Sequence, residues 1–301
     1  MTAPDCRDPR TGMALGIGAY VLWGGLPLFL KLLAGVPALQ ILAHRALWSL
    51  ALLAGAATLL GRWPPILAHA RNRRTLIMLA ASATLIATNW LIYIWAVFDG
   101  QMLAASLGYF INPLVNVALG VAVLGERLRR LQALAVGLAA VGVSAMALSG
   151  AGGIWISLAL ALTFGVYGLV RKLVAPDALA GLLIETALLA PLAIGCILWS
   201  AGQGESAFGH APGLDALLIM SGAVTAAPLL MFAAAARRMR YATLGLFQYI
   251  APTMLFLESV LLFGERMTAV HIFTFACIWI GLAIYAIDGL RGARIEPQPP
   301  E

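Results

Sequence analysis

The order of apolar and polar residues divides the chain into ten long apolar stretches separated by short polar connections. Each stretch approaches the ~20 residues that a helix needs to cross about 30 Å of hydrocarbon. The pattern therefore predicts an all-α polytopic membrane protein with ten transmembrane helices. The expected spans are 13–33, 38–60, 75–97, 102–124, 130–149, 153–173, 179–200, 213–235, 242–264 and 268–289.

The connections between these stretches are short, the longest being Gly61–Arg74 and Ala201–Pro212, so they leave no room for a soluble domain. Composition agrees, because 62% of the residues are hydrophobic and 11% are charged, against roughly 25% charged in a soluble domain. Such a chain needs an apolar exterior, and lipid tolerates one. Met13–Leu33 is longer than the apolar core of about 7–15 residues in a cleavable signal peptide, so we expect an uncleaved span.

The basic residues gather in alternate connections. If the N-terminus lies inside, 16 of the 19 Lys and Arg residues fall on the inner side. This bias predicts that both termini are cytoplasmic. Lys31 and Arg266 fall on the outer side, and Arg45 falls within a span. The net charge of +6 thus reports topology, and no basic and aromatic face indicates a nucleic-acid surface.

A short motif occurs at equal spacing in the two halves of the chain. YFINP, ending at Pro113, is followed by GER at 125–127, and YIAP, ending at Pro252, is followed by GER at 264–266. Proline and glutamate are 13 positions apart in both copies, and the offset between the copies is 139. Because the repeat has five spans, an odd number, the second copy must enter the membrane in the opposite orientation. Inverted repeats are typical of secondary transporters, with the substrate site near the midplane.

These observations predict four segments. Residues 1–12 form a cytoplasmic N-terminal segment, and 290–301 form a polar, Pro-rich cytoplasmic tail that we expect to be disordered. Between them lie a first five-helix repeat at 13–149 and a second, inverted five-helix repeat at 153–289.

Four runs of the sequence carry a family resemblance that covers about residues 13–288. They are HRALWSL, NWLIYIWAV, ASLGYFINPLVNVALGVAVLGERLRRLQ and FGVYGLVRK. They resemble the EamA-type drug/metabolite transporter superfamily and, within it, the RarD subgroup. The resemblance implies two EamA-like five-helix units forming a ten-helix transporter of the bacterial inner membrane, and export as the direction of transport.

Few charged residues lie within the predicted spans, and such residues are costly in hydrocarbon. Arg45 and Glu258 each lie roughly 10 Å below the outer surface at 1.5 Å per residue, so we predict that they pair. The alternative for Arg45 is snorkelling to the outer interface. Glu185 lies at a different depth, and Glu185 or Glu258 is a candidate for proton exchange during transport. The competing interpretation for both carboxyl groups is a structural hydrogen bond.

Proline in the middle of a span frees a backbone carbonyl and bends the helix. Pro113 and Pro252 occupy corresponding places, so we predict a hinge there, with a packing kink as the alternative. Polar and aromatic side chains around them would line a cavity for an organic solute, although each singly is more typical of helix–helix contact. The candidates for this cavity are Asn89, Trp90, Tyr93, Tyr109, Asn112, Asn116, Gln248 and Tyr249.

Other features favour structural roles. Glu126 and Glu265 are expected to cap neighbouring helices or to pair locally. Gly137, Gly142 and Gly281 indicate close helix packing, with a weak homodimer as a lesser alternative to a monomer. The three cysteines and four histidines show no ligand spacing, so neither a metal nor another cofactor is expected.

The functional interpretation is a secondary transporter that moves a small organic metabolite or drug-like solute across the lipid bilayer, rocking one five-helix unit against the other. Its partners would be that solute, the lipid and, as one option, a coupling proton. A membrane enzyme is the first alternative, but neither HExxH nor GxSxG is present. The second is a receptor or assembly partner that does not transport.

Overall fold

The computed structural model describes residues 9–125, 130–149, 153–236, 238 and 247–292, and the secondary structure of these ranges is helical. The helices are α1 Pro9–Gly24, α2 Leu26–Lys31, α3 Ala38–Leu59, α4 Trp63–Arg71, α5 Arg73–Phe98, α6 Met102–Leu124, α7 Arg130–Leu148, α8 Ile154–Leu173, α9 Ala178–Gly202, α10 Pro212–Ala236, α12 Ile250–Leu257, the π-helix η1 Glu258–Leu262 and α13 Ala269–Gly292.

Eight helical segments of the described chain are long and apolar enough to cross a membrane, and two shorter apolar segments, Ile250–Leu262 and Ala269–Tyr285, accompany them. The chain is therefore a multi-pass membrane protein. The count of ten spans remains a prediction, as does the division into 13–149 and 153–289. Residues 239–246, where the predicted ninth span begins, lie outside the described residues, as do Glu126, residues 1–8 and 293–301.

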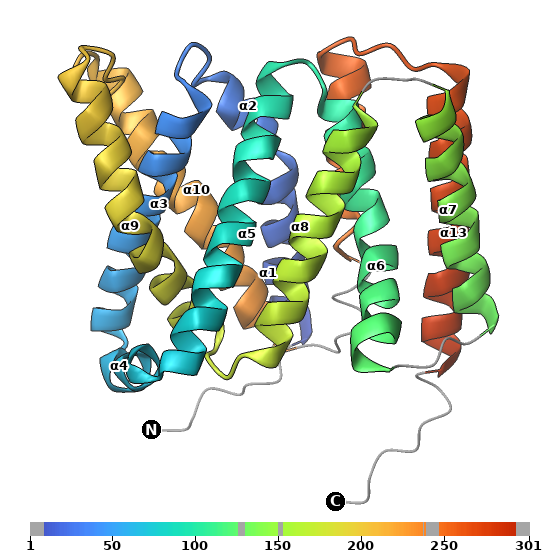
Figure 1. Cartoon of the computed structure of the whole chain (residues 1–301), viewed down its shortest axis with the longest axis horizontal. Coiled ribbons are helices and arrows are strands. Elements are labelled where there is room, and N and C mark those ends of the chain that lie inside the picture. Colours follow the sequence, from blue (N-terminus) through green and yellow to red (C-terminus); the bar gives the residue numbers. More distant parts are fainter. Residues whose placement is uncertain (1–8, 126–129, 150–152, 237, 239–246, 293–301) are drawn as a thin grey trace, which may run out of the picture.

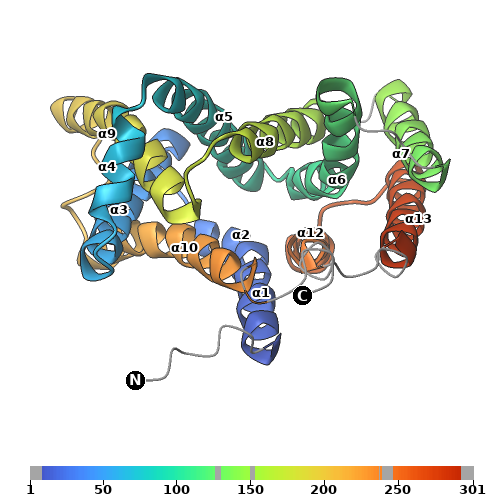
Figure 2. The same cartoon turned by 90° about the horizontal axis from the view of Figure 1, so that it is seen from below.

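Eight of the described helices form a closed ring. In order they are α1, α10, α3, α9, α5, α8, α6 and α12, which closes on α1 (Figure 2). Helices from the first half of the sequence alternate with helices from the second half at every position around this ring. The two halves are therefore interleaved, and the interface between them runs through the whole assembly.

Helices α7 and α13 stand outside the ring as a tightly packed pair (Figure 2). Gly142 of α7 permits this approach, because a Cβ there would lie 3.0 Å from Cys277 Cβ and 3.1 Å from the carbonyl oxygen of Thr274. Gly281 of α13 faces the Ala135 backbone in the same way. Both glycines thus serve close helix packing, as predicted, while a Cβ at Gly137 would meet open space.

The ends of the helices follow local sequence signals. Asn72 and Asp177 are N-caps whose side chains accept hydrogen bonds from the backbone N–H groups of Thr75 and Ala180, the usual way of satisfying first-turn donors. Gly125 ends α6 with φ +67°, a conformation that glycine adopts without steric cost.

Three local features differ from the prediction. The first span is interrupted at Gly25, where α1 ends and α2 begins with a proline in its first turn. The connection Gly61–Arg74 contains the short helix α4, which lies across the lower side of the molecule (Figure 1). The ninth stretch changes from α to π geometry at Glu258, and hydrophobic periodicity does not report such a change.

Several of the predicted inner charges that fall in the described ranges lie on one side of the molecule. The start of α1, the end of α13 and α4 are all on the lower side in Figure 1. Arg71 ends α4, Arg62 and Arg73 flank this helix, and Arg171 lies in the last turn of α8. We call this side the basic face and the other side the opposite face.

Candidate functional site

A polar cluster joins α5, α6 and α8 within the ring. Asn89 of α5 donates from Nδ2 to the Leu160 carbonyl at 3.0 Å and to Thr163 Oγ1 at 2.9 Å. Its Oδ1 accepts a hydrogen bond from the Tyr109 hydroxyl at 3.1 Å. Tyr93 meets the Tyr109 ring edge to face, with centroids 5.8 Å apart. The structure therefore brings together three of the residues predicted to line a cavity.

Arg45 of α3 is held beside this cluster and is 2% exposed. Its Nε donates to Thr225 Oγ1 of α10 at 2.9 Å, and its guanidinium lies over the Trp90 ring at 5.0 Å from the centroid. Tyr93 and Tyr109 lie near its guanidinium. Snorkelling of Arg45 to the interface is therefore wrong, because the side chain ends among α5, α6 and α10 inside the protein.

The predicted Arg45–Glu258 ion pair is also wrong. Arg45 Nη1 and Glu258 Oε2 are both buried without a hydrogen-bond partner in the described structure. Helix depth fixed only the height of each residue in the membrane and not its position around the ring. Helix α3 packs against α9 and α10, whereas α12, which continues into η1, packs against α1 and α6.

Glu258 is 6% exposed and begins the π-helical turn η1. Tyr93 lies near Glu258 and also near Arg45. Within the described residues, no Lys, Arg or His lies within salt-bridge distance of its carboxylate. Single π turns inside helices occur frequently at functional sites, so the position combines an unusual backbone with an uncompensated charge.

Glu185 of α9 has the opposite environment. It is 1% exposed, and its Oε1 accepts a hydrogen bond from Ser82 Oγ. Arg171 Nη1 lies 3.8 Å from the same oxygen, and Tyr167 is also beside this carboxylate. Gly181 makes room for the arginine, because a Cβ there would overlap its guanidinium. The arrangement fits the structural interpretation of Glu185.

The interior of the ring has an accessible surface at Phe164. Leu162 is 51% exposed and Phe164 is 36% exposed, yet the two residues are about 200° apart around α8. They therefore cannot both face lipid. The Phe164 ring contacts Tyr109 and Tyr167, so its exposed surface faces inward.

The remaining cavity candidates divide into two groups. Asn112 is buried with Oδ1 unpartnered, and Asn116 is exposed, with its Oδ1 close to Gly165 and Gly168 of α8. Both lie on α6, below Tyr109. Tyr249 instead packs against the apolar cluster of α6, α7 and α13, with the half-buried Gln248 next to it.

The two predicted hinge prolines are not equivalent. Pro113 lies inside the continuous helix α6. Pro252 lies in the first turn of α12, where the missing N–H costs little, and its carbonyl accepts a hydrogen bond from Ser106 Oγ of α6 at 2.9 Å. Pro252 therefore fixes the contact of α12 with α6, while its role as a hinge remains a prediction.

Glu265 of the second GER motif caps α6 from the opposite face. Its two carboxylate oxygens accept hydrogen bonds from Met102 N at 2.7 Å and Leu103 N at 2.8 Å. Burial raises the pKa of Glu265, although these two donors and Lys31 act in the other direction. The prediction that Glu265 caps a neighbouring helix is thus confirmed.

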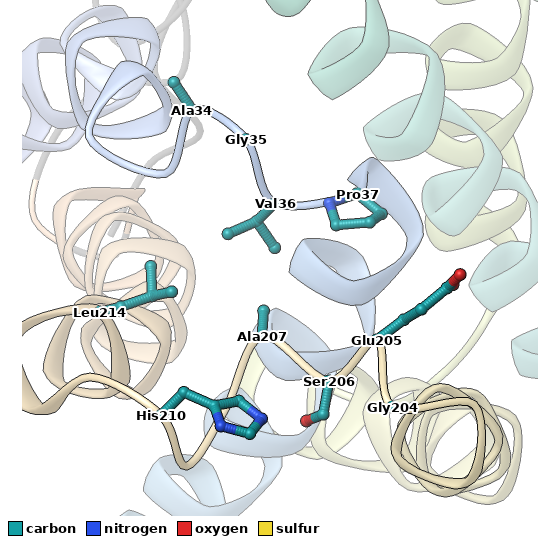
Figure 3. A pocket seen from close by; sticks show the side chains of 10 residues that line it. All are labelled: Ala34, Gly35, Val36, Pro37, Gly204, Glu205, Ser206, Ala207, His210 and Leu214. Atoms are coloured by element: carbon teal, nitrogen blue, oxygen red, sulfur yellow. The ribbon is translucent and has the colours of Figure 1, made fainter.

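A shallow cavity of about 570 Å³ opens on the opposite face, between the α2–α3 and α9–α10 connections (Figure 3). Val36, Ala207 and Leu214 contribute its apolar surface. Gln40 fixes the second connection by donating to the Glu205 carbonyl and accepting from Ala207 N. The cavity lies at the rim of the ring, away from the buried cluster.

Sequence inspection missed Thr225 and Arg171 as partners of buried charges. In the sequence Arg171 stands out only as one of the basic residues that set topology, and Thr225 is an ordinary residue of an apolar stretch. A usable signal existed for Arg171, because Tyr167 and Arg171 are four positions apart and so share a helix face. Nothing in the sequence indicated Thr225, whose importance depends on the contact between α3 and α10.

Long apolar helices around an interior of buried polar and charged side chains define a helical membrane transporter, and comparison with known proteins agrees. Residues 10–148 match the EamA-like transporter family. An uncharacterized transporter of Pseudomonas aeruginosa is 48% identical over 298 residues, covering 96% of this chain and 98% of its own. The chain belongs to this family of drug/metabolite transporters, and it is similar over its length to the RarD proteins.

Relatives that carry the RarD name match over a similar length. Protein RarD of Escherichia coli strain K12 is 45% identical over 291 residues, covering 96% of this chain and 98% of its own. A chloramphenicol-sensitive protein RarD of Pseudomonas aeruginosa is 34% identical over 292 residues, covering 96% and 97%. A crystal structure with 18% identity matches with a TM-score of 0.61 over 94% of this chain and 99% of its own, which supports the fold.

Proposed function

We propose that the protein is a secondary transporter that carries a small organic solute across the bacterial inner membrane by alternating access, with export as its direction. The observation that carries this proposal is the interior of the ring. Arg45, Glu258 and Asn112 are buried there with polar atoms that have no partner in the described structure. Unpaired polar groups in a membrane interior are costly and mark pathways for solutes.

The interleaved ring favours bending of individual helices over rocking of two separate blocks. Moving the halves as blocks would break the contacts between every pair of neighbouring helices around the ring. Pro113 inside α6 and the π turn at Glu258 are places where a helix can bend at lower cost. In this proposal, Asn89, Tyr93 and Tyr109 contact the solute while these segments change shape.

We assign the coupling role to Glu258 rather than Glu185. Glu185 receives a hydrogen bond from Ser82 and lies beside Arg171, so its charge is compensated in the state described. Glu185 and Glu258 each have a buried Oε2 without a partner, but Glu258 begins a π turn and has no Lys, Arg or His within salt-bridge distance among the described residues. A carboxylate without a fixed partner is better suited to exchange a proton with the pathway.

The test is transport by purified protein in sealed lipid vesicles, with and without a pH gradient. A panel of labelled metabolites and antibiotics, including chloramphenicol because of the name of the sensitive relative, would supply the solutes. We expect at least one solute to accumulate beyond the amount of protein present, and Glu258→Gln to abolish the dependence on the pH gradient while Glu205→Gln retains it.

Uptake that stops at one solute per protein would indicate a receptor and contradict transport. Gradient-dependent uptake that is unchanged by Glu258→Gln would leave transport intact and refute the coupling role. The direction of transport would be measured in vesicles sorted by protein orientation, which is determined from whether protease outside the vesicle can reach the basic face that carries Arg73. Faster movement out of right-side-out vesicles than into them supports export.

A further inference from the structure

The buried arginine of the ring lacks the neutralising partner that the buried glutamate Glu185 has. Arg45 offers five N–H donors, and the described structure uses Nε, which binds Thr225. Nη1 is buried without an acceptor. Leaving a buried charge uncompensated costs several kcal/mol, so the arrangement calls for an anion that the described structure does not supply.

We propose that Arg45 is the binding site for the carboxylate group of an organic solute, which makes the transported substrate an organic acid. The proposal rests on the transport function proposed above and specifies its substrate class. A guanidinium fork matches the two oxygens of a carboxylate geometrically. The fork is also held in place, because Thr225 binds its Nε and the Trp90 face lies 5.0 Å from its carbon.

The surroundings of Arg45 fit the rest of such a molecule. Tyr109 contacts the ring of Phe164, with centroids 6.1 Å apart, and it lies near Arg45. Phe164, Tyr109 and Tyr93 thus contact one another in series, and both tyrosines lie near the guanidinium. The apolar part of the acid would pack against Trp90 and Tyr109.

Glu258 does not take the place of this anion. Its helix packs against α1 and α6, on a different part of the ring from α3. Tyr93 lies near both Arg45 and Glu258. Arg45 is thus the cation available to an organic acid, which would orient with its carboxylate toward α3.

The experiment is thermal unfolding of the purified protein in detergent with a panel of aromatic and aliphatic carboxylates, each paired with its uncharged amide. Phenylacetate and phenylacetamide are the first pair. Ligands that bind the folded state raise the melting temperature. We expect several acids to raise the melting temperature of the wild-type protein, their amides to have no effect, and Arg45→Gln to weaken acid binding at least tenfold.

Arg266→Gln is the matched control, because Arg266 is exposed in the η1–α13 connection. It should bind the acids as the wild type does. Arg45→Lys keeps the charge but not the fork, so it should give an intermediate affinity. Equal responses to acids and amides, or acid binding by Arg45→Gln at wild-type affinity, would overturn the proposal.

If Arg45→Gln does not fold, Thr225→Val provides the test. It retains the charge and removes the acceptor that orients the guanidinium. A several-fold loss of acid affinity supports the proposal, and wild-type affinity overturns it.

Vesicle uptake separates this proposal from the transport function. Acids that bind but never accumulate would refute transport and leave the carboxylate site standing. Neutral solutes carried equally well by the wild type and Arg45→Gln, without any acid being carried, would confirm transport and refute the carboxylate site.

Discussion

Replacing Glu265 should loosen the first turn of α6 by an amount that follows from two hydrogen bonds. The first four N–H groups of a helix have no acceptor within the helix, and Glu265 accepts from two of them at 2.7 and 2.8 Å. Loss of an N-cap costs about 0.5–2 kcal/mol, and bonds to a charged group are worth about 1.5–3 kcal/mol each. We therefore expect Glu265→Ala to lower the local free energy of opening by about 2 kcal/mol.

Hydrogen exchange measured by mass spectrometry reports this change directly. A loss of about 2 kcal/mol corresponds to roughly 30-fold faster exchange of the Met102 and Leu103 amides. Glu265→Gln keeps one acceptor oxygen, so a loss of about 1 kcal/mol and roughly fivefold faster exchange is expected. The neighbouring variant Arg266→Gln should not change exchange at these amides.

Unchanged exchange at Met102 and Leu103 in Glu265→Ala would refute the capping role. Acceleration that extended equally through all helices would mean global destabilisation instead. The specific outcome matters for the site, because Tyr109 follows Leu103 on α6 by fewer than two turns. A loosened first turn should therefore also weaken solute binding moderately, without removing any side chain that contacts the solute.

Two further substitutions test packing and burial. Gly222→Ala should lower the free energy of unfolding by about 1–3 kcal/mol or more, because the new Cβ would overlap the backbone of Trp48 in α3; this loss would be seen as a lower melting temperature. Gly213→Ala is the control, because a Cβ there meets open space. Equal effects of the two substitutions would contradict the reasoning. Ser82→Ala should lower the free energy of unfolding, measured by thermal unfolding, by about 1–3 kcal/mol, because it removes the hydrogen-bond donor to a buried carboxylate. The same substitution should have a much smaller effect when Glu185 is already replaced by Gln. Additive losses in the double variant would show that the bond is unimportant.

Hydrophobic runs predicted the helical membrane fold well because a bilayer imposes length and composition on each span. The described spans α3 and α5 begin and end within a few residues of the expected positions. The break at Gly25 and the helix α4 were missed, since both belong to short segments in which apolar and polar residues do not form a long pattern. The π turn at Glu258 depends on hydrogen bonding of the backbone, which residue type does not determine.

The site was predictable in its members but not in its pairings. Asn89, Tyr93 and Tyr109 were identified because polar residues in apolar stretches are rare, and the structure places them together. The pairing of Arg45 with Glu258 failed because residue number along a helix gives depth in the membrane and nothing about the neighbours of that helix. Only the order of helices around the ring shows that Arg45 meets α10 instead.

That order also explains where the polar contacts of the protein lie. Lipid is as apolar as a leucine side chain, so helices in a membrane are held by close packing and by interhelical hydrogen bonds. The described polar contacts between distant residues connect first-half with second-half helices in nearly every case, as in Arg45–Thr225, Asn89–Thr163 and Ser106–Pro252. A helix that bends during transport must exchange some of these bonds. Because Arg45 and Glu258 begin with polar atoms unpaired, they can form new bonds to a solute or a proton without first breaking existing ones.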